Sequence, residues 1–149
     1  MMYDDKFLMD YATRIKKIYD NNINSDNNFT LTFSLFCGLI SVIDKEVRKE
    51  IFSKIELPKY INPTKNSILQ DEKIKTVAIM RHFRNSLCHF KVDRQQIISD
   101  NQGNIIKIVF KDKYFKENKK ICNFSCELNI EELNNFFNFI LEKIIVSGK

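Results

Sequence analysis

The sequence has few of the residues that form flexible linkers, since its 149 residues include only three glycines and two prolines. We therefore predict a single domain over residues 1–149, a length that allows a real core. Long apolar runs are also missing, because residues 29–43 are interrupted by polar side chains and are too short to span a bilayer. The acidic N-terminus does not resemble a secretory signal, so the sequence predicts a cytoplasmic protein without a membrane segment.

The four cysteines, Cys37, Cys88, Cys122 and Cys126, form no CxxC pair. Cys122 and Cys126 would share one face of a strand, but roughly 13 Å apart, which is too far to hold one metal ion. We expect neither a zinc site nor a structural disulfide, which fits a reducing compartment. The sequence also lacks a glycine-rich phosphate loop, so no cofactor and no metal are predicted.

What the sequence does have is a small excess of positive charge, +5 at pH 7, with an isoelectric point of about 9.0. This excess slightly favours a polyanionic partner. Many basic proteins bind no nucleic acid, so the charge alone does not decide the class of the protein.

Apolar residues recur with a helical period in four segments, which predicts a mainly α fold. The four expected helices cover about residues 4–19, 30–53, 67–89 and 130–147. Asn129 with Glu132 suits the N-terminal cap of the last helix, and Pro58 ends the pattern of the second. Helices of this kind need one another to bury their apolar stripes, so we predict a four-helix bundle.

A different pattern separates the third and fourth helices. Residues 95–99, 105–111 and 122–128 read as short strands, and Asp100–Asn104 has the composition of a turn. We predict a small antiparallel β-sheet, inserted at about residues 94–128, before the last helix.

The third helix carries unusual residues on the face away from its core stripe. That face holds two arginines, both histidines, an amide and a cysteine: Arg81, His82, Arg84, Asn85, Cys88 and His89. One or two turns earlier the same face carries the apolar residues Ile74, Val77 and Ala78. An apolar patch that points away from the core suggests a partner, either another part of this chain or a second copy. We favour a second copy and predict these three residues as a dimer interface.

The segment Arg84-Asn85-x-x-x-His89 resembles the signature of the HEPN superfamily, an arginine, a polar residue, variable positions and a histidine. The resemblance implies a helical bundle with the motif late in one helix, as in the layout predicted above. For active members it implies metal-independent RNA cleavage. The inserted strands resemble small HEPN proteins associated with plasmids and phage defence, so a toxin or defence effector, with an antitoxin or regulatory partner, is one expectation.

The residue types suit that chemistry. When the 2′-hydroxyl of RNA attacks the adjacent phosphate, a base near neutral pKa must take its proton, and His89 can do so. Arg84 can stabilise the charge that grows on the phosphate oxygens, and Asn85 can orient either the histidine or the phosphate. We predict Arg84, Asn85 and His89 as catalytic residues, and Arg81, His82, Cys88 and Lys91 as contacts to RNA or to a second chain.

The two histidines lie seven residues apart, about 10.5 Å along a helix, which is too far to serve one phosphate. We therefore predict a composite site at a homodimer interface, with His89 contributed by both copies.

Two other functional classes stay open. The first is a non-catalytic HEPN module that binds nucleotide or RNA or serves as a regulatory subunit. The second is a helical interaction protein in which the pair of arginine and histidine is accidental.

Overall fold

The computed structural model describes residues 5–22, 28–43, 45–64, 75–88, 97–116 and 119–147, with the backbone alone at 5, 88, 113–116 and 119–123. These residues form, in order, α1 (Asp5–Asn22), α2 (Asn28–Val42), α3 (Lys45–Phe52), α4 (Lys75–Cys88), β1 (Ile97–Ser99), β2 (Ile105–Lys116), β3 (Lys119–Asn129) and α5 (Ile130–Ser147). The predicted mainly helical fold, with a small antiparallel sheet before the last helix, is confirmed. No helix in these ranges is long and apolar enough to cross a membrane.

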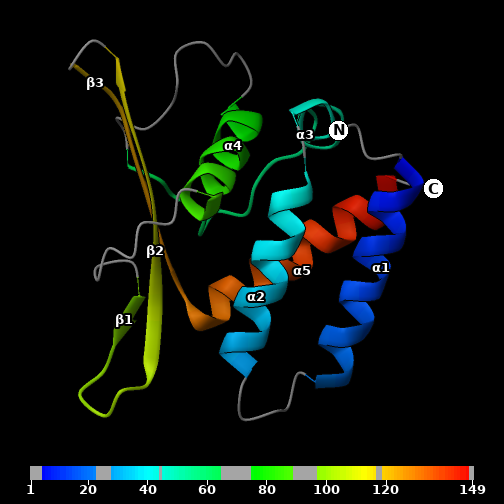
Figure 1. Cartoon of the computed structure of the whole chain (residues 1–149), viewed down its shortest axis with the longest axis horizontal. Coiled ribbons are helices and arrows are strands. Elements are labelled where there is room, and N and C mark those ends of the chain that lie inside the picture. Colours follow the sequence, from blue (N-terminus) through cyan, green and yellow to red (C-terminus); the bar gives the residue numbers. More distant parts are fainter. Residues whose placement is uncertain are drawn as a thin grey trace.

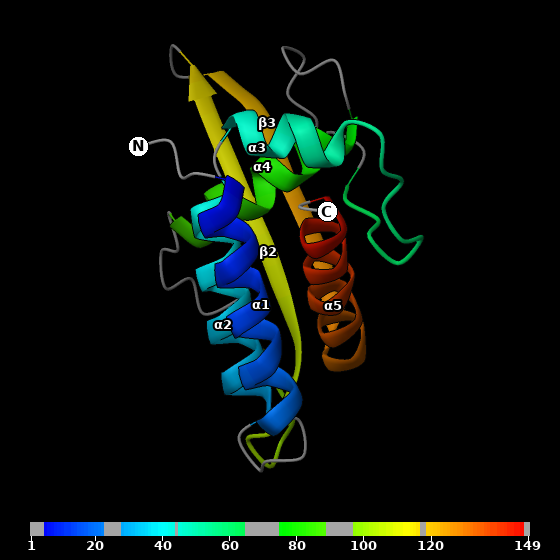
Figure 2. The same ribbon diagram turned by 90° about the vertical axis from the view of Figure 1, so that its right-hand side faces the viewer.

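The sheet stands against one side of the helices, next to α4, and α1 lies on the side far from it (Figure 1). Helices α1, α2 and α5 run side by side, and α3 and α4 lie across their upper part (Figure 2). Asn134 of α5 connects these three neighbouring helices, because its Oδ1 accepts hydrogen bonds from Tyr19 Oη of α1 (3.1 Å) and Thr32 Oγ1 of α2 (2.9 Å). A half-buried polar side chain thus has partners in both neighbouring helices.

The predicted second helix, residues 30–53, is two helices in the structure, so that prediction was wrong at Ile43. The backbone N–H of Ile43 donates to the carbonyl of Ile40 (3.3 Å), a bond that tightens the last turn of α2. The guanidinium of Arg48 then donates to the carbonyl of Ile43 (2.9 Å). A side chain from α3 therefore satisfies a carbonyl that a continuous helix would bond internally, and α3 leaves in a new direction.

The sheet has the order β1-β2-β3, and all neighbours are antiparallel. The predicted turn is confirmed: Asp100 Oδ1 accepts the backbone N–H groups of Gln102 and Asn104, each at 2.9 Å, and Gly103 has a φ of 83°. The two long strands extend further than predicted, with β2 reaching Lys116. The residues from Asp112 to Lys116, where no strand was predicted, continue β2.

Phe83 of α4 lies at the centre of the core between helices and sheet. Its ring is fully buried and packs against four others, with centroid distances of 5.0 to 6.4 Å: Phe36, Phe110, Phe124 and Phe136. Because these rings come from α2, β2, β3 and α5, one aromatic cluster fixes the sheet to the helices.

The predicted capping pair of the last helix is present. The Oδ1 of Asn129 accepts the backbone N–H of Glu132 (2.8 Å), and Glu132 Oε2 accepts the backbone N–H of Asn129 (2.9 Å). We expect Asn129→Ala to lower the free energy of unfolding by about 0.5–2 kcal/mol, as measured by urea denaturation. Asn135→Ala, at an exposed position inside α5, is the matched control and should leave stability nearly unchanged or slightly raised. Equal losses in the two variants would contradict a capping role.

Candidate functional site

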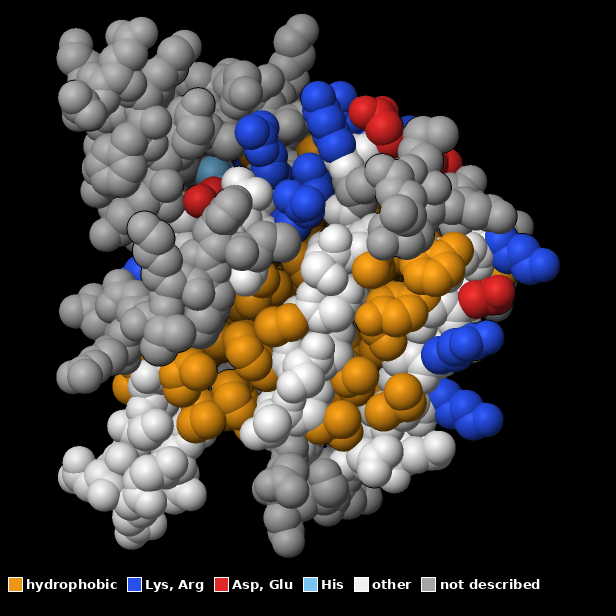
Figure 3. Space-filling view, in the orientation of Figure 1, with side chains coloured by type: hydrophobic (Ala, Val, Ile, Leu, Met, Phe, Trp, Pro, Cys, Tyr) orange, Lys and Arg blue, Asp and Glu red, His pale blue; other side chains and the backbone are white. Residues whose placement is uncertain are grey.

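Helix α4 carries the described part of the predicted site. Arg81, Arg84 and Asn85 are half-buried in its second half, and Cys88 is its last residue. The helix contains no acidic residue. Figure 3 shows Lys and Arg side chains gathered over α4 and beside α3, above a wide apolar area along α2. Ile74, His89 and Lys91 lie outside the described residues.

The structure corrects the prediction for Val77, Ala78 and His82. Val77 is 2% exposed, while Ala78 and His82 are 0% exposed, all within this one chain. The reason is that α4 packs against β2, α3 and α2 of its own chain, which leaves these side chains no surface for a second copy. Val77 and Ala78 therefore do not form a dimer interface, and His82 does not contact RNA or a second chain in this structure.

His82 instead belongs to a hydrogen-bonded group between α4 and the sheet. Its Nδ1 donates to Oδ2 of Asp112 in β2 at 2.9 Å, and its ring stacks on Phe124 of β3 with centroids 4.7 Å apart. The Nδ2 of Asn85 donates to the same Asp112 oxygen at 3.2 Å. One carboxylate oxygen thus links a buried histidine to one of the predicted catalytic residues.

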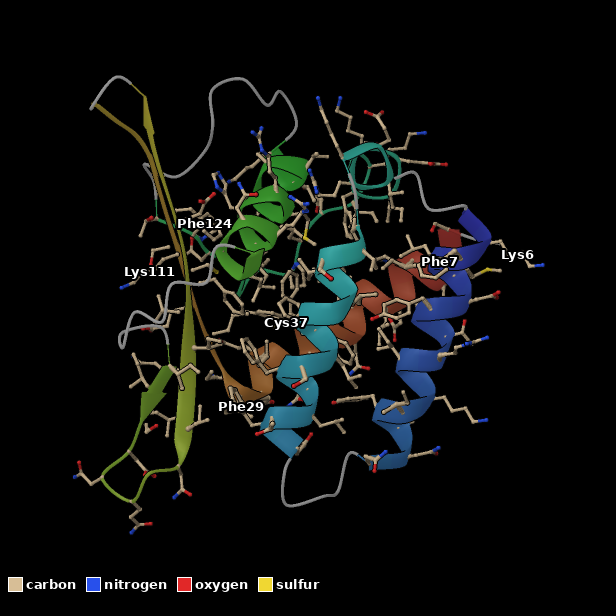
Figure 4. All side chains as sticks on the ribbon, viewed as in Figure 1. Lys6, Phe7, Phe29, Cys37, Lys111 and Phe124 are labelled. Atoms are coloured by element: carbon tan, nitrogen blue, oxygen red, sulfur yellow. The ribbon has the colours of Figure 1, made fainter. Side chains whose placement is uncertain are left out.

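The sheet register explains why Asp112 reaches α4. Asp112 of β2 pairs directly with Phe124 of β3. Two residues earlier in β2, Phe110 pairs with Cys126. Alternate residues of a strand share a face, so Phe110 and Asp112 both face the helix, and Lys111 faces away. Figure 4 shows Phe124 on the side of the sheet next to α4, and Lys111 pointing to the opposite side.

Arg84 differs in its hydrogen bonding from Arg48, the buried arginine of α3. Its Nε atom is shielded from solvent and has no hydrogen-bond partner in the part of the chain that the structure describes. Arg48 also has an unpartnered Nε, but its guanidinium donates to a backbone carbonyl. Buried donors normally find partners, so the donors of Arg84 suit an acceptor that is not supplied by the described residues, such as a phosphate oxygen.

The described residues contain no group of three or more His, Cys, Asp or Glu side chains that could hold a metal ion. Burial raises the pKa of the Cys126 thiol to about 12. Cys126 is therefore a neutral core side chain, because the thiolate that binds metals does not form at neutral pH.

Comparison with known proteins adds one match. The family model described as HEPN pEK499 p136 matches residues 1–148, nearly the whole chain. The chain belongs to this HEPN family. No curated protein and no solved structure matches it. Membership supports a HEPN-type nuclease or a related module, and HEPN domains often dimerise and bind RNA.

The sequence interpretation of this HEPN protein missed Asp112. The residue stands between two lysines, a run that is typical of a solvated loop. A signal was nevertheless present, because Ile108, Phe110 and Asp112 continue one alternating face. Extending the predicted strand by one residue would have placed Asp112 on the face that covers α4.

We expect His82→Phe to lower the free energy of unfolding by about 1–3 kcal/mol. Phenylalanine keeps a ring against Phe124, but it gives Asp112 no donor, so a sheltered carboxylate loses one of its two hydrogen bonds. Urea denaturation measures the change. Glu127→Gln, which weakens a more exposed ion pair with Lys107 on the same sheet, is the control and should cost less than about 1 kcal/mol. A His82→Phe protein as stable as wild type would contradict a stabilising role for this hydrogen bond.

Proposed function

We propose that this HEPN protein is a metal-independent endoribonuclease that cleaves RNA by attack of a 2′-hydroxyl on the adjacent phosphate. The observation that carries the proposal is the sheltered Nε of Arg84, which has no partner among the described residues and lies next in sequence to Asn85 on a helix without acidic residues. A rigid donor fork to which the described residues offer no carboxylate suits the phosphate oxygens, which gain charge in the transition state. His89, five residues later, is the proposed base.

The proposed site is composite, with one part from each copy of a homodimer. Cleavage needs a base for the 2′-hydroxyl and an acid for the leaving 5′-oxygen. The chain has only two histidines, and His82 is fully buried and bonded to Asp112. A second imidazole would therefore come from His89 of another copy. The dimer contact would use a surface other than Val77 and Ala78, since these are buried within the chain.

The test is incubation of purified protein with total cellular RNA in the presence of EDTA, with wild type beside His89→Ala. We expect cleavage by wild type alone, with 2′,3′-cyclic phosphate ends on the products. Those ends distinguish attack by the 2′-hydroxyl from attack by water. If a clean wild-type dimer leaves RNA intact but binds it, the protein is a non-catalytic HEPN module and this proposal is wrong.

In the cell, this activity would suit a cytoplasmic toxin or phage-defence effector that is kept inactive by an antitoxin or another regulatory partner. Such an enzyme would stop growth when expressed alone. The check is colony formation under induced expression of wild type and of His89→Ala, with protein levels matched by immunoblot. Equal growth of the two strains would contradict an effector role.

A further inference from the structure

We propose that Asp112 is a positioning residue that turns the side-chain oxygen of Asn85 away from the sheet, toward a hydrogen-bond donor of the site. The inference rests on the proposed function and deepens it. An asparagine side chain could contact either the phosphate or the nucleophilic side of the reaction. We assign Asn85 to the nucleophilic side.

Asp112 is itself held in place. Its Oδ2 accepts from Nδ1 of His82 (2.9 Å) and from Nδ2 of Asn85 (3.2 Å), and its side chain is 13% exposed. His82 is fully buried and stacked on Phe124, which pairs with Asp112 in the sheet. The carboxylate is therefore fixed by the sheet on one side and by a buried imidazole on the other.

The contact between Asp112 and Asn85 also has a fixed polarity. An ionised carboxylate only accepts hydrogen bonds, so the atom of Asn85 that faces Asp112 must be the amide nitrogen. The amide group is planar, with its oxygen and nitrogen on different sides of Cγ. Oδ1 of Asn85 is therefore turned away from Asp112, and it has no hydrogen-bond partner among the described residues.

That oxygen can bind only a hydrogen-bond donor. Phosphate oxygens are acceptors, so Oδ1 of Asn85 does not bind them. Besides the guanidinium of Arg84, which the proposed function assigns to the phosphate, the donors of an RNA-cleaving site are the 2′-hydroxyl and the ring N–H of His89. Asn85 then serves the nucleophile or its base, and Arg84 serves the phosphate. This division of roles follows from Asp112, because without its carboxylate the amide could turn over and present its NH₂ group.

The first experiment does not depend on cleavage. In ¹⁵N-edited NMR spectra of the wild-type protein, the side-chain amide of Asn85, assigned with Asn85→Ser, is expected to lie outside the region of solvated asparagines. In Asp112→Ala it should move into that region, and Asp112→Asn, which keeps an acceptor oxygen, should retain part of the shift. If the wild-type Asn85 amide already resembles that of a solvated asparagine, the proposal is overturned, whether or not any variant folds poorly.

The second experiment is a double-mutant cycle on the rate of RNA cleavage. Asp112→Ala is expected to lower kcat roughly 10- to 100-fold in the wild-type background, since a displaced catalytic group costs rates of that size. In an Asn85→Ala background the same change should have little effect on kcat. Equal reductions in both backgrounds would overturn the proposal, because a general loss of structure would act in both. Glu127→Ala, on the same sheet and away from α4, is the control and should leave kcat unchanged.

A third measurement identifies the donor. Wild type should bind an RNA oligonucleotide more tightly than the same strand with 2′-deoxyribose at the cleaved position. If Asn85→Ala removes that preference, the donor is the 2′-hydroxyl. If the preference remains and the acidic limb of the pH–rate profile moves, the donor is His89 acting as the base. If neither changes, Oδ1 contacts no donor and the inference is wrong. If the NMR signal shows a hydrogen-bonded Asn85 amide but the protein cleaves no RNA, the proposed ribonuclease function is wrong. The hydrogen bond between Asn85 and Asp112 would then still stand.

Discussion

Replacing Phe83 with alanine is expected to lower the free energy of unfolding by about 3–5 kcal/mol. The ring is fully buried and packs against rings from α2, β2, β3 and α5, so its removal leaves a cavity where the sheet meets the helices. Domains of this size are stable by only about 5–15 kcal/mol, so the variant should be close to unfolding at 37 °C. Urea denaturation followed by circular dichroism measures the loss.

Phe7→Ala is the matched control for that experiment. Phe7 is 42% exposed on α1 and stacks on Tyr11 with ring centroids 5.8 Å apart, so the same chemical change removes much less buried surface. We expect a loss of roughly 1 kcal/mol or less. If both variants lost the same amount, the cluster around Phe83 would not be the main contact between the sheet and the helices.

The helices were predictable because their signals are local. The apolar stripe of α1 and the cap at Asn129 depend on residues within one or two turns of one another. The break between α2 and α3 was not predictable in this way, because it depends on Arg48 reaching back to one carbonyl. A helical period continues on both sides of that break, so the pattern alone cannot reveal it.

The environment of the site was less predictable than the helix that carries it. The pattern of α4 identified Arg84 and Asn85 as unusual, but it could not tell which surface would cover Val77 and Ala78. Either another part of the chain or a second copy satisfies the same apolar pattern. The choice depends on the register of β2 with β3 and on where the sheet packs, and both are set by contacts between residues far apart in the sequence.

Arg84→Ala is expected to lower kcat/KM for RNA cleavage by about 100- to 1,000-fold, the range for loss of one group that stabilises developing negative charge. Stability should change little, because the Nε of Arg84 has no hydrogen-bond partner to lose among the described residues. Arg84→Lys keeps the charge but not the planar fork, and should give intermediate rates. Arg14→Ala, at an exposed position on α1, is the matched control and should cleave like wild type.

The His89→Ala variant tests whether the site is composite. The proposed site takes its base and its acid from His89 of the two copies, so a dimer with one His89→Ala chain lacks one of these groups. When equal amounts of wild type and His89→Ala are dissociated and reassembled, random pairing makes a quarter of the dimers wild type and half of them mixed. We therefore expect roughly a quarter of the activity of the same total amount of wild type. About half of that activity, with mixed dimers confirmed by mass spectrometry, would show that each copy acts with its own histidine. Dimerisation would then have no part in assembling the reacting groups.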